Sequence, residues 1–282
     1  MRIVSLQPSI TLTLAALHRL ETICGLTKYC VEAMPELAQR NIPVLHDSWT
    51  ANTAEITTCR PTLVIASVPY RMESLAAILK AGLPVLAMAP QSLADVFADI
   101  RLLATLTDAV DAGEMLIASC ESELAAAAAA TEACQRPTVY CEEWGKPLIR
   151  SQAWVAELVT AAGGEFAGHP GSHTTAEDVA ASDPEVMIFA WCGAGDRVPL
   201  ARVVQKRGWE ALRAVREGRV FCVPDELLNT PAHTLMDGLR CLGAALHPGI
   251  FPAHHRLVRL GSEAAYTHAA YDGSTGNTPR RL

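Results

Sequence analysis

Polar and aromatic side chains follow several short apolar runs of this chain, and they are its best candidates for chemistry. Such runs predict buried strands, and α/β proteins place ligand contacts just after the carboxyl ends of parallel strands. In the first half of the chain these residues are Gln7, Pro8, Ser9, Thr27, Lys28, Tyr29, Pro69, Tyr70 and Arg71. In the second half they are Glu143, Trp144, Trp191, Cys192, Gly193 and residues 226–230, among them Asn229. We therefore expect a ligand-binding site assembled from several strand ends.

Aromatic residues make up only 5% of the chain, so their positions are informative. Tyr70, Trp144 and Trp191 all fall at predicted strand ends. Such rings would hold a broad, flat, partly apolar ligand, for example a tetrapyrrole or corrin, through stacking and area burial. Trp144 and Trp191 could instead pack beneath their own loops. Trp209 lies inside a helical pattern, where we expect a core residue.

Three polar candidates have alternative interpretations. Arg71 suits the carboxylate or amide rim of a ligand, although the pair Tyr70 and Arg71 could also be a solvated loop. Glu143 could equally be a helix-terminus residue. Cys192 precedes a glycine at a strand end and is the cysteine to test for reactivity, while buried inert thiols are the more common case.

Metal-binding and catalytic motifs have little support. His169 and His173 lie four residues apart in a loop rich in Gly and Pro, and His254 and His255 are adjacent, but neither pair has a carboxylate or thiolate at zinc-site spacing. Surface histidines are the simpler interpretation, and we expect no metal site. The chain also lacks GxSxG, P-loop and GxGxxG motifs, so a hydrolase, a nucleotidase or a Rossmann dehydrogenase is not indicated and no catalytic residue is assigned.

The elements that would position these residues occur twice. Each half opens with a short β-branched run, passes through a polar turn into a helical pattern, and continues with alternating strand and helix signals. Between the halves, residues 108–134 are continuously helical in pattern and include six alanines at 125–130, the best helix formers. The pattern predicts an α/β fold of two Rossmann-like parallel-sheet lobes joined by a long backbone helix. An ordinary amphipathic surface helix is the alternative for this segment.

The expected organisation has four parts. They are an N-terminal α/β lobe at 1–107, a connecting helix at 108–135, a C-terminal α/β lobe at 136–250 and a tail at 251–282. We expect the ligand in the cleft between the two lobes.

Composition excludes several classes of protein. With 282 residues, half of them hydrophobic, the chain can bury a large core without metal or disulfide staples. The net charge is −7 and no segment gathers basic residues, so nucleic acid is an unexpected partner. No window holds the roughly 20 apolar residues that a membrane-spanning helix requires.

The expected location is the cytosol. The apolar N-terminal segment is interrupted by Gln7, Pro8 and Ser9, unlike the continuous core of a secretory signal. Nine cysteines without a CxxC pair are typical of reduced thiols. A periplasmic or lipid-anchored protein is the alternative, in case a natural signal has been removed.

Five segments, taken in order, resemble the helical-backbone substrate-binding proteins, the class that includes vitamin B12, siderophore and haem binders of ABC importers. They are RIVSLQPSITLTLAAL, RPTLVIAS, EEWGKPLIRSQAWVAELVTAAGG, DPEVMIFAWCG and GWEALRAVREGRVFCVP. The resemblance covers about residues 2–248 and is nearest to the cobalamin-binding-protein branch that has no evident signal peptide. It implies two α/β lobes, a long connecting helix and little hinge closure. It also implies a ligand contact at Trp49, where the resembling proteins have a cleft aromatic.

The chain departs from that branch in two places. The branch commonly has PSATE after the first strand, where this chain has Pro8-Ser9-Ile10-Thr11-Leu12 and lacks the acidic residue. Near the end of the second strand the branch tends to have a Cys-rich or His-Glu-Cys stretch, where this chain has Thr27-Lys28-Tyr29-Cys30. These departures bear on which ligand is bound.

Three functional hypotheses follow. The favoured one is a non-catalytic binding protein that sandwiches a corrinoid, such as cobalamin, between aromatic residues and requires no other cofactor. The second is a chelatase-like enzyme or chaperone acting on a metallated tetrapyrrole, which would need a His or carboxylate such as His46 or Glu143. The third is a siderophore or haem binder of an ABC importer, with export, basic cleft residues and a permease partner.

Overall fold

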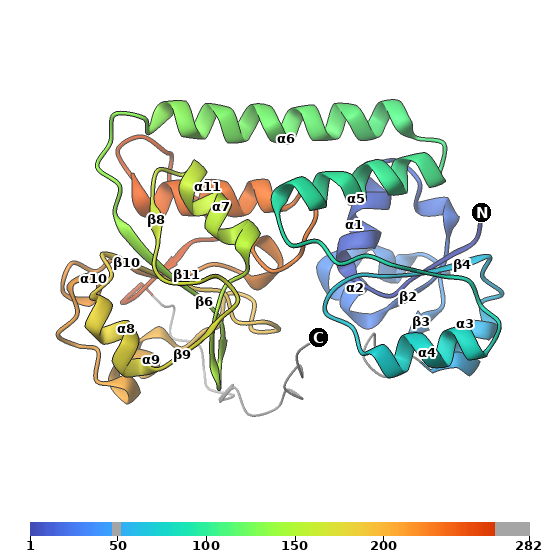
Figure 1. Cartoon of the computed structure of the whole chain (residues 1–282), viewed down its shortest axis with the longest axis horizontal. Helices are drawn as coiled ribbons and strands as arrows, with labels where there is room; N and C mark the ends of the chain where they lie inside the picture. The colour runs from blue at the N-terminus through green and yellow to red at the C-terminus, as the bar shows by residue number, and fades with distance from the viewer. Residues whose placement is uncertain (47–51, 263–282) are drawn as a thin grey trace. The chain divides into compact units, whose positions relative to one another are not determined.

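Short apolar runs of the first half form a parallel sheet. The structure is a computed structural model that describes residues 1–46 and 52–262, in two compact units (Figure 1). Unit 1 comprises Met1–Cys120 and Pro231–His233, and unit 2 comprises Glu121–Thr230 and the chain from Thr234 onward. The strands of unit 1 are β1 (Ile3–Ser5), β2 (Ile23–Thr27), β3 (Val44–Leu45), β4 (Leu63–Ala66) and β5 (Val85–Ala87).

The strand order of this sheet is β3-β2-β1-β4-β5, and every pair is parallel. Side chains alternate between its two faces. Ile3 and Ile65 contribute to one core cluster, and Val4 and Val64 contribute to the other. The chain order reverses between β1 and β4, which makes the carboxyl ends of these two strands the topological switch point of the sheet.

Helices follow the strands of unit 1, as the sequence pattern predicts. They are α1 (Pro8–Ala16), α2 (Lys28–Ala33), α3 (Thr53–Thr58), α4 (Met72–Lys80) and α5 (Leu93–Leu106), with 3-10 turns η1 (Leu20–Thr22) and η2 (Pro35–Gln39). Ser92 and Asp95 form a reciprocal capping box at the start of α5, which satisfies two backbone N–H groups there.

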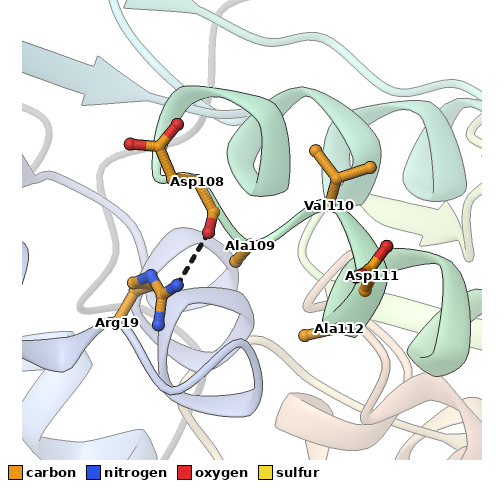
Figure 2. A pocket seen from close by; sticks show the side chains of 6 residues that line it. All are labelled: Arg19, Asp108, Ala109, Val110, Asp111 and Ala112. Atoms are coloured by element: carbon orange, nitrogen blue, oxygen red, sulfur yellow. Dashed lines mark hydrogen bonds between the residues drawn. The ribbon is translucent and has the colours of Figure 1, made fainter.

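The long helix predicted at 108–134 is present as α6 (Val110–Ala130) and continues from unit 1 into unit 2. Gly113 allows α6 to approach α5 closely, because a Cβ at this position would lie 2.6 Å from Cβ of Ala104. Arg19 braces the junction of the two helices by donating to the carbonyls of Thr107 and Asp108, both at 2.7 Å. Arg19 and residues 108–112 line a surface pocket of about 430 Å³ (Figure 2).

Unit 2 contains a mixed sheet, which corrects the expectation of a parallel sheet in both lobes. Its strand order is β12-β11-β10-β6-β7-β9, with β8 also paired to β6. The strands are β6 (Thr138–Gly145), β7 (Leu148–Arg150), β8 (Glu165–Phe166), β9 (His173–Thr174), β10 (Val186–Phe189), β11 (Val220–Cys222) and β12 (Val258–Arg259). β11, β10, β6 and β8 pair in parallel, whereas β7, β9 and β12 join antiparallel.

The antiparallel pairing of β7 with β6 has a local cause. Residues 142–145 are the end of β6, and only Lys146 and Pro147 separate this strand from β7. A connection of two residues can return the chain only as a hairpin, because a parallel crossover needs a dozen or more residues.

The helices of unit 2 pack a core rich in aromatic residues. They are α7 (Ala153–Ala161), α8 (Ala176–Ser182), α9 (Leu200–Arg207), α10 (Arg213–Arg216) and α11 (Leu235–Leu246), and the 3-10 turn η3 (Asp225–Leu227) follows β11. Tyr140 meets Phe189 and Trp209 edge to face, the arrangement that aromatic pairs favour. Trp209 is fully buried, which confirms the expectation of a core residue.

We predict that Arg19→Met lowers the free energy of unfolding by about 1–3 kcal/mol, because two carbonyls at the α5–α6 junction lose a charged donor. Thermal and urea melts measure the change. Arg40→Met, which alters an exposed arginine of the same unit, is the control, and equal melting of the two variants would show that the brace contributes nothing.

Candidate functional site

The carboxyl ends of β6, β10 and β11 lie along one edge of the unit 2 sheet. The loop after β10 stays hydrogen-bonded to β6, because the Ala190 amide donates to the Glu142 carbonyl at 2.9 Å and the Cys192 amide donates to the Glu143 carbonyl at 3.1 Å. Most of the side chains predicted for the second half therefore meet at this edge.

A buried ion pair holds this edge together. Glu142 is fully buried, and each of its two carboxylate oxygens accepts a hydrogen bond from the guanidinium of Arg207, at 2.8 and 2.9 Å. The Tyr140 hydroxyl and the Trp191 indole N–H also donate to Glu142, at 2.5 and 2.7 Å. Burial, with the neighbouring Glu142 charge, raises the pKa of Tyr140, so this phenol stays a hydrogen-bond donor. A buried carboxylate needs such a complete set of partners.

The network gives Trp191 a packing role. Its ring is 8% exposed and belongs to the core cluster of unit 2, and the Arg207 guanidinium lies 5.8 Å from its centroid. Gly145 leaves space for the ring, because a Cβ there would lie 2.7 Å from the indole. Of the two interpretations of Trp191, the structure favours packing over ligand stacking.

Trp144 differs from Trp191 because it is only half-buried. It lies on the β6–β7 hairpin opposite Ile149. Its indole N–H donates to the Lys146 carbonyl at 2.7 Å, which fixes the ring to its own turn. The ring keeps a surface on which a flat ligand can stack.

Glu143, Cys192 and Asn229 form a linked group next to this network. Nε2 of Gln152 donates to one oxygen of Glu143 at 2.5 Å. The Asn229 amide nitrogen donates to the Ala190 carbonyl at 2.7 Å and to Sγ of Cys192 at 3.3 Å. Its carbonyl oxygen Oδ1 is buried and has no hydrogen-bond donor among the described residues.

Burial controls the protonation of this group. It raises the pKa of Glu143 from an ordinary 4.5 to about 7, against the opposing effect of the Gln152 hydrogen bond. Burial, together with Glu143 and Asp225, raises the pKa of Cys192 well above its usual value. Cys192 is therefore a thiol at neutral pH, which disfavours the reactive role considered for it.

Asp225 fixes the loop that contains Gly193. Its carboxylate accepts the backbone N–H groups of Gly193 and Gly195, at 2.7 and 2.8 Å. Both glycines have positive φ, 78° and 59°, and residues other than glycine rarely adopt this backbone conformation. Burial raises the pKa of Asp225, although the two N–H groups oppose this.

In unit 1, several predicted contacts gather at the ends of β1 and β4. Nε2 of Gln7 donates to the Pro69 carbonyl at 2.7 Å and so joins the two strand ends. Pro8 opens α1, and Ser9 is buried in its first turn. Tyr70 packs partly against the core, and half-buried Arg71 precedes α4.

The remaining predicted residues of unit 1 are less closely connected. Tyr29 is half-buried in α2, and the ammonium of Lys28 lies 5.0 Å from its ring centroid. His46 is exposed, and its backbone N–H donates to Glu55 at 3.2 Å. Trp49 lies outside the described residues, so its predicted contact stays a prediction.

Three residues of the site were missed by the sequence analysis: Glu142, Arg207 and Asp225. Glu142 had a usable signal, because a carboxylate inside the apolar strand pattern of β6 requires a buried cation. Arg207 and Asp225 had none, since their partners lie far away in sequence.

Neither a metal centre nor a membrane span is found in the part of the chain that the structure describes. No three His, Cys, Asp or Glu side chains are placed there to share an ion. His169 and His173 are exposed. None of the described helices combines the length and apolarity needed to traverse a bilayer.

We predict that Glu142→Gln lowers the free energy of unfolding by about 3–5 kcal/mol, because it leaves the Arg207 cation buried without its counter-charge. The double variant Glu142→Gln/Arg207→Met should recover most of the lost free energy of unfolding, because it no longer buries an unpaired cation. Glu217→Gln breaks an exposed pair with Arg213 and should cost less than about 1 kcal/mol. Urea unfolding measures the free energy of unfolding of each variant. If Glu142→Gln lowers it no more than Glu217→Gln does, the ion pair does not have this role.

The pKa of Glu143 also predicts a pH dependence. Since this pKa is raised in the folded state, the native protein binds the proton more tightly, and stability falls as pH rises from about 4.5 through about 7. Glu143→Gln removes this contribution, which is at most about 3 kcal/mol. The difference in melting temperature between wild type and Glu143→Gln should therefore grow across that window. Exposed Glu177→Gln is the control, and parallel pH profiles of wild type and Glu143→Gln would contradict the assignment.

Solved structures similar to this chain are binding proteins. A periplasmic heme binding protein from Pseudomonas aeruginosa matches with a TM-score of 0.79 and 22% identity, over 92% of this chain and 97% of that one. A periplasmic heme-binding protein from Roseiflexus sp. RS-1 matches with a TM-score of 0.75 and 26% identity, over 88% and 98%. The periplasmic vitamin B12 binding protein of Vibrio cholerae matches with a TM-score of 0.69 and 21% identity, over 86% and 95%.

Sequence comparison gives the family. No curated protein matches the chain significantly, but the family model described as periplasmic binding protein matches residues 3–227. That family is one of solute-binding proteins and agrees with the expectation of a binding protein rather than an enzyme. With its two α/β units and the long helix α6, the chain belongs to the periplasmic binding protein family, in its helical-backbone class.

Proposed function

We propose that this protein binds a corrinoid, and that the strand ends of unit 2 recognise the amide groups around the corrin ring. The observation that carries the proposal is a group of hydrogen-bond acceptors formed by Glu143, Asp225 and Asn229, hereafter the acceptor cluster. All three are linked to the loop after β10, through the contacts of Cys192, Gly193 and Gly195.

The acceptor cluster favours a ligand that donates hydrogen bonds. The buried oxygen of Asn229 has no donor among the described residues, and an unpaired buried acceptor costs about 1–3 kcal/mol unless a ligand supplies the donor. Within the described chain, no lysine or arginine is ion-paired with Glu143 or Asp225. The cluster is therefore acidic or neutral, depending on pH.

This chemistry distinguishes corrin from haem. The corrin rim carries primary amides, whose N–H groups donate and whose carbonyls accept. The haem rim carries propionates, which are acceptors only and are repelled by carboxylates. Half-buried Trp144, on the neighbouring hairpin, supports the proposal by offering a ring for stacking on the macrocycle.

Haem or a siderophore is the second candidate. Three of the similar structures are named as heme-binding proteins and one as a vitamin B12 binding protein. Arg71 and Lys28 at strand ends of unit 1 are cations that suit carboxylates. The chelatase hypothesis has lost support, because the family is one of binding proteins.

The partner and the location are also proposals. A structurally similar protein from Listeria monocytogenes is named an ABC transporter substrate-binding protein, and an importer permease would be the corresponding partner here. The periplasmic location in the names of the similar proteins supports export, the alternative in the sequence analysis, rather than the cytosol. The cysteines form no disulfide bonds in this structure, and this observation supports the cytosol.

The test is a titration of purified protein with dicyanocobinamide and with haemin, followed by absorbance and tryptophan fluorescence. We expect cobinamide to bind more tightly than haemin. Asn229→Leu, which removes the unpaired acceptor, should weaken cobinamide by at least about tenfold, or about 1.4 kcal/mol. Glu143→Lys should weaken cobinamide and strengthen haemin.

Glu177→Lys is the matched control, because it makes the same charge change at an exposed site of unit 2 and should leave both affinities unchanged. Circular dichroism checks that each variant is folded. Tighter binding of haemin than of cobinamide by the wild type would replace the corrinoid proposal with the haem one.

A further inference from the structure

The switch point of the unit 1 sheet carries polar groups that the proposed function does not use. Gln7 ends β1 and its side chain reaches the Pro69 carbonyl beyond β4. Because Ser5 pairs with Ile65 in parallel register, continuing the register places Ser67 beside Gln7. Ser9 follows in the first turn of α1. Gln7, Ser9 and Ser67, with the backbone N–H groups of Ser9 and Ile10, are called the α1 N-terminal cluster below.

The donors of this cluster lack partners. No side chain caps α1, and its first residue is Pro8, which has no N–H. Among the described residues, no acceptor is found for the backbone N–H of Ser9 or of Ile10. The α1 N-terminus therefore presents two N–H groups together with the positive end of the helix dipole.

Two buried hydroxyls give an independent indication of a ligand. Ser9 is 5% exposed and Ser67 is 1% exposed, and the hydroxyl oxygen of each has no hydrogen-bond partner in the described structure. Buried hydroxyls are normally paired. The neighbouring Ser5 shows the normal case, since its hydroxyl donates to the Gln7 carbonyl at 3.1 Å and lies 2.7 Å from that of Thr11.

These groups share one chemistry. Backbone N–H groups at a helix start, the helix dipole and serine hydroxyls all favour an anion with several oxygens. A strand, a short polar turn and a helix start at a topological switch point are also the usual elements of a phosphate or carboxylate site in α/β folds.

We propose that the α1 N-terminal cluster binds an oxyanion, a phosphodiester or a carboxylate. The inference rests on the proposed function for the identity of the molecule that carries the anion. In a complete corrinoid the group is the phosphodiester of the nucleotide loop, and in haem it is a propionate. The cluster then selects ligands with an anionic arm over those without one.

Ser9→Asp tests the cluster directly, because it places a carboxylate of the protein at the second position of α1. Ala94→Asp is its matched control, since Ala94 is exposed and occupies the second position of α5. Thermal melting is compared in sodium phosphate and in sodium chloride of equal ionic strength. Phosphate should raise the melting temperature of the wild type and of Ala94→Asp by more than that of Ser9→Asp, because all three share its general stabilising effect and only Ser9→Asp lacks the site.

Two paired titrations identify the molecule that carries the anion. Cobalamin is compared with cobinamide, which lacks the phosphodiester, and haemin is compared with its dimethyl ester. The wild type and Ala94→Asp should prefer the anionic member of one pair by at least about tenfold, and Ser9→Asp should bind both members equally. The preferred pair shows whether the group is a phosphodiester or a carboxylate.

The inference is overturned if phosphate raises the melting temperature of Ser9→Asp as much as that of the wild type. Failure of the proposed function gives a different result, in which neither corrinoid binds. The phosphate experiment then still decides whether the cluster is an oxyanion site. Ser9→Ala adds a folding check, because removing an unpaired buried hydroxyl should not lower the melting temperature in chloride.

Discussion

The buried carboxylate of Glu142 is the constraint on which the candidate site of unit 2 depends. A charge without water must be matched by donors, and here they come from β6, the loop after β10 and α9. Satisfying Glu142 therefore joins three segments and fixes Trp191, whose ring occupies the space that Gly145 leaves. Glu143 and Trp144 follow directly in β6, so their positions are determined by the same network.

The two units present different chemistry at their strand ends. The acceptor cluster of unit 2 has an unpaired carbonyl oxygen and two carboxylates with raised pKa values. The α1 N-terminal cluster of unit 1 has hydroxyls and backbone N–H groups without partners among the described residues. Amide groups are complementary to the first set, and an oxyanion is complementary to the second. A binding protein can leave such polar groups unpaired, because a bound ligand supplies their partners.

Much of this architecture could be predicted from local pattern. The apolar run before Gln7-Pro8-Ser9 forms β1, the alanine-rich segment forms α6, and Trp209 is buried. The antiparallel β6–β7 hairpin could not be predicted, because the apolar run of β6 ends at Cys141 in the sequence, whereas the strand continues to Gly145. The choice between packing and ligand contact at Trp191 could not be made from the sequence, because the ion pair that surrounds this ring joins residues 65 positions apart. Periodicity indicates that a ring lies at a strand end, but not whether a buried acceptor holds it there.

The most direct measurement is a crystal structure of the protein with bound cobinamide. We expect amide nitrogens of the corrin rim to lie within hydrogen-bond distance of Oδ1 of Asn229 and of the Glu143 carboxyl. The corrin ring should lie next to Trp144, and Trp191 should still donate to Glu142. A complex in which the corrin amides contact neither Asn229 nor Glu143, or in which Trp191 leaves Glu142 to stack on the ring, would contradict it.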